Sequence, residues 1–326
     1  MPDEPTVLRW ETLTKSAFDR LDRGRCVVLV TCSPLEVHGP HLPLGADALE
    51  GDGLAERLLR FLPERHRSRT FLRLPFVYAA TDVVPQPGSL FFRPGTTMAF
   101  LEDLGASLAA QGFRDVLVSN FHGGPRHFVA LEQACERVSR RRAIRMVSVF
   151  SLVLKRLAGK GGETLEGLLG SIPGLRVEDL AGDTHGGLLE TSQLLALCGG
   201  WVDPVYKELP RSTVDGWLAQ TQRGGGELPV GRLAGLLTLL RSNRGTVRYF
   251  LDQTYSGAPA GASAEIGEQI LDRLGARAAE DVAQVLDGAL SPFDCHSPLW
   301  RLRFLFLNPW MIRLVDRLIG FRNPIA

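Results

Sequence analysis

Three residues that can bind metal ions lie close together in residues 36–47. Glu36 and His38 are two positions apart after a short apolar run, and Asp47 begins an apolar pattern with helical spacing. Side chains two positions apart in an extended chain share a face, and a mixture of carboxylates and imidazoles suits Zn, Mn or Fe. Asp47 could instead cap the helix, with Glu36 and His38 as ordinary loop residues. Because Pro40 and Pro43 stiffen this loop, the cluster favours a functional site.

Two later segments add further candidate residues beside glycines. His122 precedes two glycines at the end of an apolar run, where the glycines let the backbone approach a ligand. His185 precedes a predicted helix, and Glu190 follows five positions later. These side chains could reach a common site. Alternatively, Asp183 or Thr184 caps the helix and Glu190 is a solvated acid of its first turn.

Strand-like and helix-like patterns alternate along most of the chain. Short β-branched runs predict strands, and apolar residues at helical spacing predict helices. The predicted strands are 26–32, 70–79, 115–120 and 143–152, and the predicted helices are 47–62, 97–111, 125–140, 186–197 and 263–290. This alternation predicts an α/β fold with a parallel sheet and helices on both faces. Ligands of such sheets bind at the carboxyl ends of the strands, where the candidate residues lie.

Length, charge and cysteine content limit the class of protein. The 326 residues exceed a usual domain of about 100 to 200 residues, so one large domain with an appendage is expected. The chain has 37 basic and 36 acidic residues, a balance that gives no reason to expect nucleic acid as a partner. The five cysteines lack paired CxxC spacing, and the N-terminus lacks an apolar run of signal-peptide length. A reducing, cytoplasmic location is therefore expected.

The three polar segments together resemble the creatininase (creatinine amidohydrolase) family. Their motifs are Glu-x-His-Gly-Pro-His-Leu-Pro-Leu-Gly-x-Asp from residue 36, Asn-x-His-Gly-Gly from residue 120 and His-x-Gly-x-x-Glu-Thr-Ser from residue 185. The resemblance implies a three-layer αβα sandwich with a mostly parallel central sheet. It also implies a homo-oligomer such as a hexamer, two divalent metal ions (Zn, Mn or Fe) and a metal-activated water as nucleophile.

The same resemblance implies a role for each motif residue. Glu36 and His122 would hold one metal ion, His38 would hold the other, and Asp47 would bridge the two. His185 matches the histidine that transfers protons during amide cleavage.

The acid that completes the second metal site departs from creatininase itself. That enzyme has a glutamate two positions after the histidine that matches His122, where this chain has Gly124. Glu190 is expected to take its place. Asp183 is the reserve candidate and joins His185 among the predicted catalytic residues.

The implied reaction is cleavage of a C–N bond in a small cyclic amide, a formamide or a short peptide. Pro125 replaces a common asparagine of the family, and a Ser-x-Glu-His segment usual upstream of Pro-Gly-Thr is missing. Creatinine itself is therefore not the expected substrate. A peptidase that trims a cofactor-precursor peptide, and a metal-binding or regulatory protein without turnover, are the alternatives.

The predicted division is an amidohydrolase domain over 1–290 and a basic amphipathic extension over 291–326. Glycines interrupt residues 155–182, which predicts an insertion or lid outside the core. In residues 298–326, arginines alternate with aromatic and aliphatic residues whose runs are too short to span a bilayer. This extension could make peripheral contact with a membrane surface. Packing on the core or at a subunit interface is the favoured interpretation.

Overall fold

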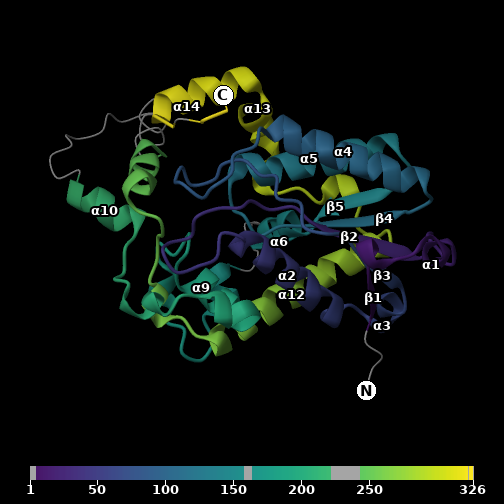
Figure 1. Ribbon diagram of the computed structural model, residues 1–326, viewed down its shortest axis with the longest axis horizontal. Coiled ribbons are helices and arrows are strands. Elements are labelled where there is room, and N and C mark those ends of the chain that lie inside the picture. The colour runs from purple at the N-terminus through teal and green to yellow at the C-terminus, as the bar shows by residue number, and fades with distance from the viewer. Residues whose placement is uncertain (1–4, 158–163, 222–242, 322, 326) are drawn as a thin grey trace.

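The computed structural model describes residues 5–157, 164–221, 243–321 and 323–325, and a parallel sheet lies at its centre. The strand order is β1-β3-β2-β4-β5. The strands are β1 (Thr6–Arg9), β2 (Cys26–Thr31), β3 (Thr70–Arg73), β4 (Asp115–Ser119) and β5 (Arg145–Ser148). Helices cover both faces of this sheet (Figure 1). The predicted α/β fold with a mostly parallel sheet is therefore confirmed.

Alternate residues of the strands belong to two separate cores. In β2, Val27 and Leu29 pack in one apolar cluster, whereas Val28 and Val30 pack in another. Because successive strand side chains point to opposite faces, each cluster lies between the sheet and one helical layer. The first layer contains α2 (Ala46–Phe61), α6 (Val149–Leu157), α9 (Leu188–Cys198) and α12 (Ala264–Leu286). The second contains α4 (Pro94–Ala110) and α5 (Pro125–Arg141).

Two predicted strands are shorter than their apolar runs. The strand predicted at 70–79 ends at Arg73, before Pro75, which has no N–H to donate to a sheet. The run at 143–152 divides, because β5 ends at Ser148 and α6 begins at the next residue. The Ser148 hydroxyl oxygen accepts hydrogen bonds from the backbone N–H and the hydroxyl of Ser151, which satisfies the start of the helix. An apolar run alone does not distinguish a buried strand from a buried helix.

Residues 155–182 pack differently from the prediction. The described part includes α7 (Leu165–Leu169) and α8 (Val177–Leu180), and residues 158–163 lie outside the described residues. Leu168, Leu169 and Ile172 are buried in the same apolar cluster as α12. The expectation that this stretch lies outside the core is therefore wrong for its described part. The division of the chain at residue 290 stays a prediction.

The sequence patterns also missed several short elements. The edge strand β1 contains no buried residue, so its pairing with β3, rather than its own pattern, defines it. The other short helices are α1 (Lys15–Asp19), α3 (Glu64–Arg67), α10 (Val214–Thr221), α13 (Arg303–Leu307) and α14 (Pro309–Ile319).

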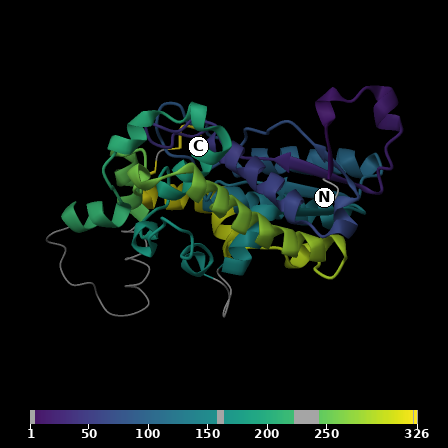
Figure 2. The same cartoon turned by 90° about the horizontal axis from the view of Figure 1, so that it is seen from below.

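Helix α12 packs closely against α2 and α9 through glycines. This long helix, drawn in yellow-green, crosses the side of the molecule seen in Figure 2. A Cβ atom at Gly267 would lie 1.9 Å from the backbone oxygen of Ser192, and one at Gly275 would lie 2.3 Å from the Cβ of Arg57. These contacts leave no room for a methyl group, so glycine sets the distance between the helices.

We expect Gly267→Ala to lower the free energy of unfolding by about 1–3 kcal/mol, because the added methyl group overpacks the contact with α9. Alanine has a higher helix propensity than glycine, so a loss of stability reports the steric clash between the added methyl group and Ser192. Gly95→Ala, in α4 where the added Cβ meets no atom within 4 Å, is the matched control and should cause no loss. Urea denaturation measures both variants. Equal stability of the two would contradict the proposed close contact.

Candidate metal centre

The candidate ligands lie at the carboxyl ends of two neighbouring strands. Glu36 and His38 follow β2, and His122 follows β4, which pairs with β2 in parallel. Asp47 is the second residue of α2, directly after the loop from β2. Because parallel strands end at the same edge, segments far apart in the chain meet here.

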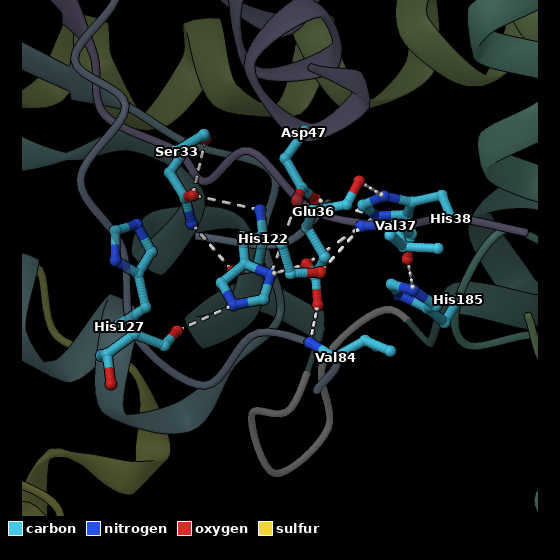
Figure 3. Close-up of polar contacts among 12 residues, drawn as sticks. Ser33, Glu36, Val37, His38, Asp47, Val84, His122, His127 and His185 are labelled. Atoms are coloured by element: carbon cyan, nitrogen blue, oxygen red, sulfur yellow. Dashed lines mark hydrogen bonds and ion pairs between the residues drawn. The ribbon is translucent and has the colours of Figure 1, made fainter. Parts of the chain in front are cut away.

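Five side chains form two groups that share Asp47. One group is Glu36, Asp47 and His122, and the other is His38, Asp47 and Glu190; the ligand atoms of each lie within 4.8 Å of one another. Nδ1 of His122 lies 3.6 Å from Oδ2 of Asp47, and Nε2 of His38 lies 3.4 Å from Oδ1. The two carboxylate oxygens of Asp47 thus face different histidines (Figure 3).

Each group is completed by a further carboxylate. Nδ1 of His122 lies 3.0 Å from Oε2 of Glu36. Nε2 of His38 lies 3.8 Å from Oε2 of Glu190 and 4.0 Å from Oε2 of Glu36. The structure therefore brings together all five residues that were predicted as metal ligands.

Backbone carbonyls orient both histidines. Nδ1 of His38 donates to the carbonyl oxygen of Glu36 at 3.1 Å, and Nε2 of His122 donates to that of Thr81 at 3.0 Å. Since a carbonyl oxygen can only accept, these contacts place a proton on the outer nitrogen of each ring. The inner nitrogens, Nε2 of His38 and Nδ1 of His122, face the carboxylates and are the ring atoms that could bind a metal once they lose their protons.

The inner atoms of the cluster lack ordinary partners. Oε2 of Glu36, Nε2 of His38 and Oδ2 of Asp47 are buried without a hydrogen bond. Burial lowers the pKa of His122, but Glu36 and Asp47 together raise it to about 9. The pKa of His38 is likewise raised well above its usual value, because its neighbouring carboxylates outweigh burial. Buried acids arranged in this way fit divalent cations, which supply the missing positive charge and take the place of these protons.

Glu190 is the carboxylate that belongs to the second group alone. Burial raises its pKa to about 7, opposed by the positive charge of His38. Its Oε2 also accepts the backbone N–H of Gly186, which stands in the left-handed region at φ 56°. This hydrogen bond holds the Glu190 carboxylate, which lies in the first turn of α9, toward the cluster.

His185 lies beside the second group, and it forms a third possible ligand group with Glu36 and His38. Its ring stacks on that of His38, with 4.1 Å between centroids, and its Nε2 donates to the carbonyl oxygen of Val37 at 2.8 Å. Burial and the neighbouring His38 hold the pKa of His185 well below its usual value. The ring is therefore neutral at pH 7, with Nδ1 as a proton acceptor.

Asp183 has a different place from that predicted. Its carboxylate accepts the backbone N–H groups of Leu188, Leu189 and Ala258. It belongs to none of the ligand groups found among the described residues. The structure therefore places Asp183 as a cap for α9, the helix that carries Glu190, and not in the cluster.

These features agree with a match to a known family. The family model Creatininase, described as creatinine amidohydrolase, matches residues 11–282. The chain belongs to the creatininase family. No curated protein matches it. Family membership and the candidate ligands support a metal-dependent amidohydrolase.

Solved creatininases share the fold at low identity. A glutamate-to-glutamine mutant creatininase complexed with creatine has a TM-score of 0.56 at 19% identity, and the match covers 86% of this chain and 99% of that chain. A creatininase described with Mn has a TM-score of 0.55 at 19% identity, over 86% and 99%. A mutant creatininase of Zn-Zn type has a TM-score of 0.53 at 20% identity, over 85% and 97%. Likeness at this identity concerns the fold.

A loop that the motifs did not reveal holds two of the candidate ligands, Glu36 and His122, in place. The Val84 N–H donates to Oε1 of Glu36, and the Thr81 carbonyl accepts from His122. Between them, Asp82 has a left-handed backbone at φ 63°. No sequence signal marked this loop, because its contacts use backbone atoms.

Glu50 is a buried acid that sequence analysis also missed. It lies on α2 three positions after Asp47, and neither of its oxygens has a hydrogen bond within the described structure. Burial, together with Glu190 and Asp47, raises its pKa well above the usual value. Glu50 is therefore a buried acid without a hydrogen-bond partner behind the candidate ligands. The sequence did hold a signal for Glu50: residues three positions apart on one helix, such as Asp47 and Glu50, lie on the same face.

An ionic network connects the loop to the end of the chain. Asp82 accepts the backbone N–H of Arg126 at 2.7 Å and pairs with its guanidinium at 3.3 Å. The same guanidinium pairs with Asp316 of α14, and both side chains are nearly buried. Helix α14, which lies beyond the family match, thereby supports the loop that contacts Glu36 and His122.

We expect Asp316→Asn to lower the free energy of unfolding by about 1–3 kcal/mol, because it removes a buried charge-assisted hydrogen bond to Arg126. Metal affinity should also fall, by up to about tenfold, since the support of the ligands loosens. Asp19→Asn breaks an exposed pair with Lys15 and should change neither property. Urea denaturation and metal titration measure the two effects. Unchanged stability of the Asp316 variant would contradict the supporting role.

Proposed function

We propose that this chain is a two-metal amidohydrolase that cleaves the C–N bond of a small cyclic amide, a formamide or a short peptide. The observation that carries this proposal is the pair of ligand groups that share Asp47. A single carboxylate facing two histidines through separate oxygens suits a pair of cations better than one.

The ligand roles follow from the distances. Glu36 and His122 would hold one ion, His38 and Glu190 would hold the other, and Asp47 would bridge them. When bound, two divalent ions would polarise an amide carbonyl and lower the pKa of a water molecule. Relatives described with Mn and of Zn-Zn type support one of these metals here.

His185 would move the protons of the reaction. Its Nε2–H is held by the Val37 carbonyl, which leaves Nδ1 to accept a proton from the attacking water. As the C–N bond breaks, the same nitrogen returns this proton to the leaving nitrogen. The carbonyl side becomes a carboxylic acid (formic acid from a formamide) and the nitrogen side an amine, and both groups stay in one ring-opened molecule when the amide is cyclic. Because the ring is already neutral at pH 7, it can serve as the base without first losing a proton.

The proposed substrate is a small amide other than creatinine. One solved creatininase is complexed with creatine, which supports a small nitrogenous substrate. Gly124 and Pro125 differ from the creatininase pattern beside His122, so a different amide is proposed. A homo-oligomer and a cytoplasmic location stay predictions from the sequence.

Metal analysis tests the shared site directly. We expect about two ions per chain in protein purified without chelators, falling to about one in Glu190→Gln, because that change removes one ligand of the second site. Asp47→Asn should lose both ions. Glu178→Gln, at an exposed acid in α8, is the control and should retain both. Elemental analysis gives the ratio. One ion in the parent protein, or two in Asp47→Asn, would contradict a bridged pair.

Turnover separates the enzyme from a metal-binding protein without activity. The parent protein should hydrolyse at least one member of a panel of formamides, lactams and short peptides. We expect His185→Ala to retain its metals and lose about 10²–10⁴-fold in kcat, because it removes the proton carrier. His296→Ala, outside the cluster, should retain full activity. A fully metal-loaded parent that hydrolyses nothing in the panel would favour the non-catalytic alternative.

A further inference from the structure

The end of the chain presents an apolar and basic surface. We call the exposed side chains of residues 301–318 the tail surface. It comprises Arg301, Leu302, Arg303, Phe304, Leu305, Pro309, Trp310, Arg313, Leu314, Arg317 and Leu318. These residues lie on and beside α13 and α14, at the edge of the molecule next to α5 (Figure 1).

Helix α14 has two distinct faces. Ile312 and Asp316 are buried, and Asp316 is fixed by its ion pair with Arg126. Trp310, Leu314 and Leu318 repeat every four residues on the opposite face and are 76%, 49% and 47% exposed. The inner face therefore fixes the orientation of the helix, and the outer face is left without an apolar partner in the described structure.

The charge of this segment has one sign. Residues 298–326 contain five arginines and a single acid, Asp316, which lies on the inner face. Arg301, Arg303, Arg313 and Arg317 form no ion pair with a described carboxylate. Two of them lie over indole rings instead: Arg303 over Trp300 at 4.5 Å and Arg313 over Trp310 at 5.0 Å.

We propose that the tail surface binds an anionic membrane surface. Exposed tryptophan and leucine side chains can enter the headgroup region, while the arginines beside them pair with lipid phosphates. The described residues include no helix of sufficient length and apolarity to cross a bilayer, so the contact is peripheral. Because the inner face of α14 stays attached to Arg126, binding requires no unfolding of the tail.

A second copy of the chain is a poorer occupant of the same surface. In a two-fold symmetric contact, the outer face of α14 would meet itself. Arg313 and Arg317 would then face arginines, with no exposed acid in the segment to compensate. Anionic lipid supplies the missing negative charge.

The test is flotation of the full-length protein with vesicles. We expect binding to vesicles of phosphatidylcholine mixed with phosphatidylglycerol, weakening as salt is raised, and little binding to phosphatidylcholine alone. Arg313→Gln with Arg317→Gln should weaken binding by about 25-fold, from about fivefold for each arginine near the surface. Trp310→Ser with Leu314→Ser should also weaken it, since this removes the apolar contact.

Arg114→Gln with Arg142→Gln is the matched control, because both arginines are exposed and lie outside the tail surface. This pair should retain parental binding, and thermal unfolding should show that all variants remain folded. Failure of the parent to bind the anionic vesicles, or equal binding by the Arg313/Arg317 pair, would overturn the proposal. Light scattering gives a further test. If the parent protein is an oligomer, and both the Arg313/Arg317 and the Trp310/Leu314 double variants dissociate it, the tail surface is a subunit interface and the proposal is overturned.

Discussion

Buried carboxylates at one edge of the sheet determine much of this structure. Glu36, Asp47 and Glu50 are almost completely buried, and Glu190 is half-buried beside them. Removing charged groups from water is costly unless a positive charge or a hydrogen bond compensates them. His38 and His122 lie between these acids, whose negative charges raise the pKa of both rings. The proposed pair of cations meets the same requirement.

Such a site depends on backbone atoms as much as on its side chains. Carbonyls of Glu36 and Thr81 fix the two histidine rings, and backbone N–H groups of Val84 and Gly186 hold two of the acids. Because these backbone groups lie in segments that adjoin β2, β3, α4 and α9, the contacts orient the candidate ligands without a bound ion. Preorganisation of this kind is what a hydrolytic metal site requires.

Helix α14 connects the candidate metal centre to the outer surface of the protein. Helix α14 lies beyond the family match, yet Asp316 reaches Arg126, and Arg126 holds Asp82 in the loop that touches both Glu36 and His122. The opposite face of the same helix is the tail surface. Binding at the tail surface would therefore affect a helix whose Asp316 is linked, through Arg126 and Asp82, to the loop beside the candidate metal centre.

The sequence by itself determined the fold class, the family and the identity of the clustered residues. Local periodicity specified α2, α4, α5, α9 and α12, and the motifs around Glu36 and His122 carried the candidate ligands because neighbouring parallel strands end at one edge. Only the tertiary structure decided that Asp183 caps α9, and that Asp82, Arg126 and Asp316 meet. It also decided that β5 gives way to α6 at Ser148. These outcomes depend on contacts between distant segments and on backbone hydrogen bonds, which residue types and local spacing do not encode.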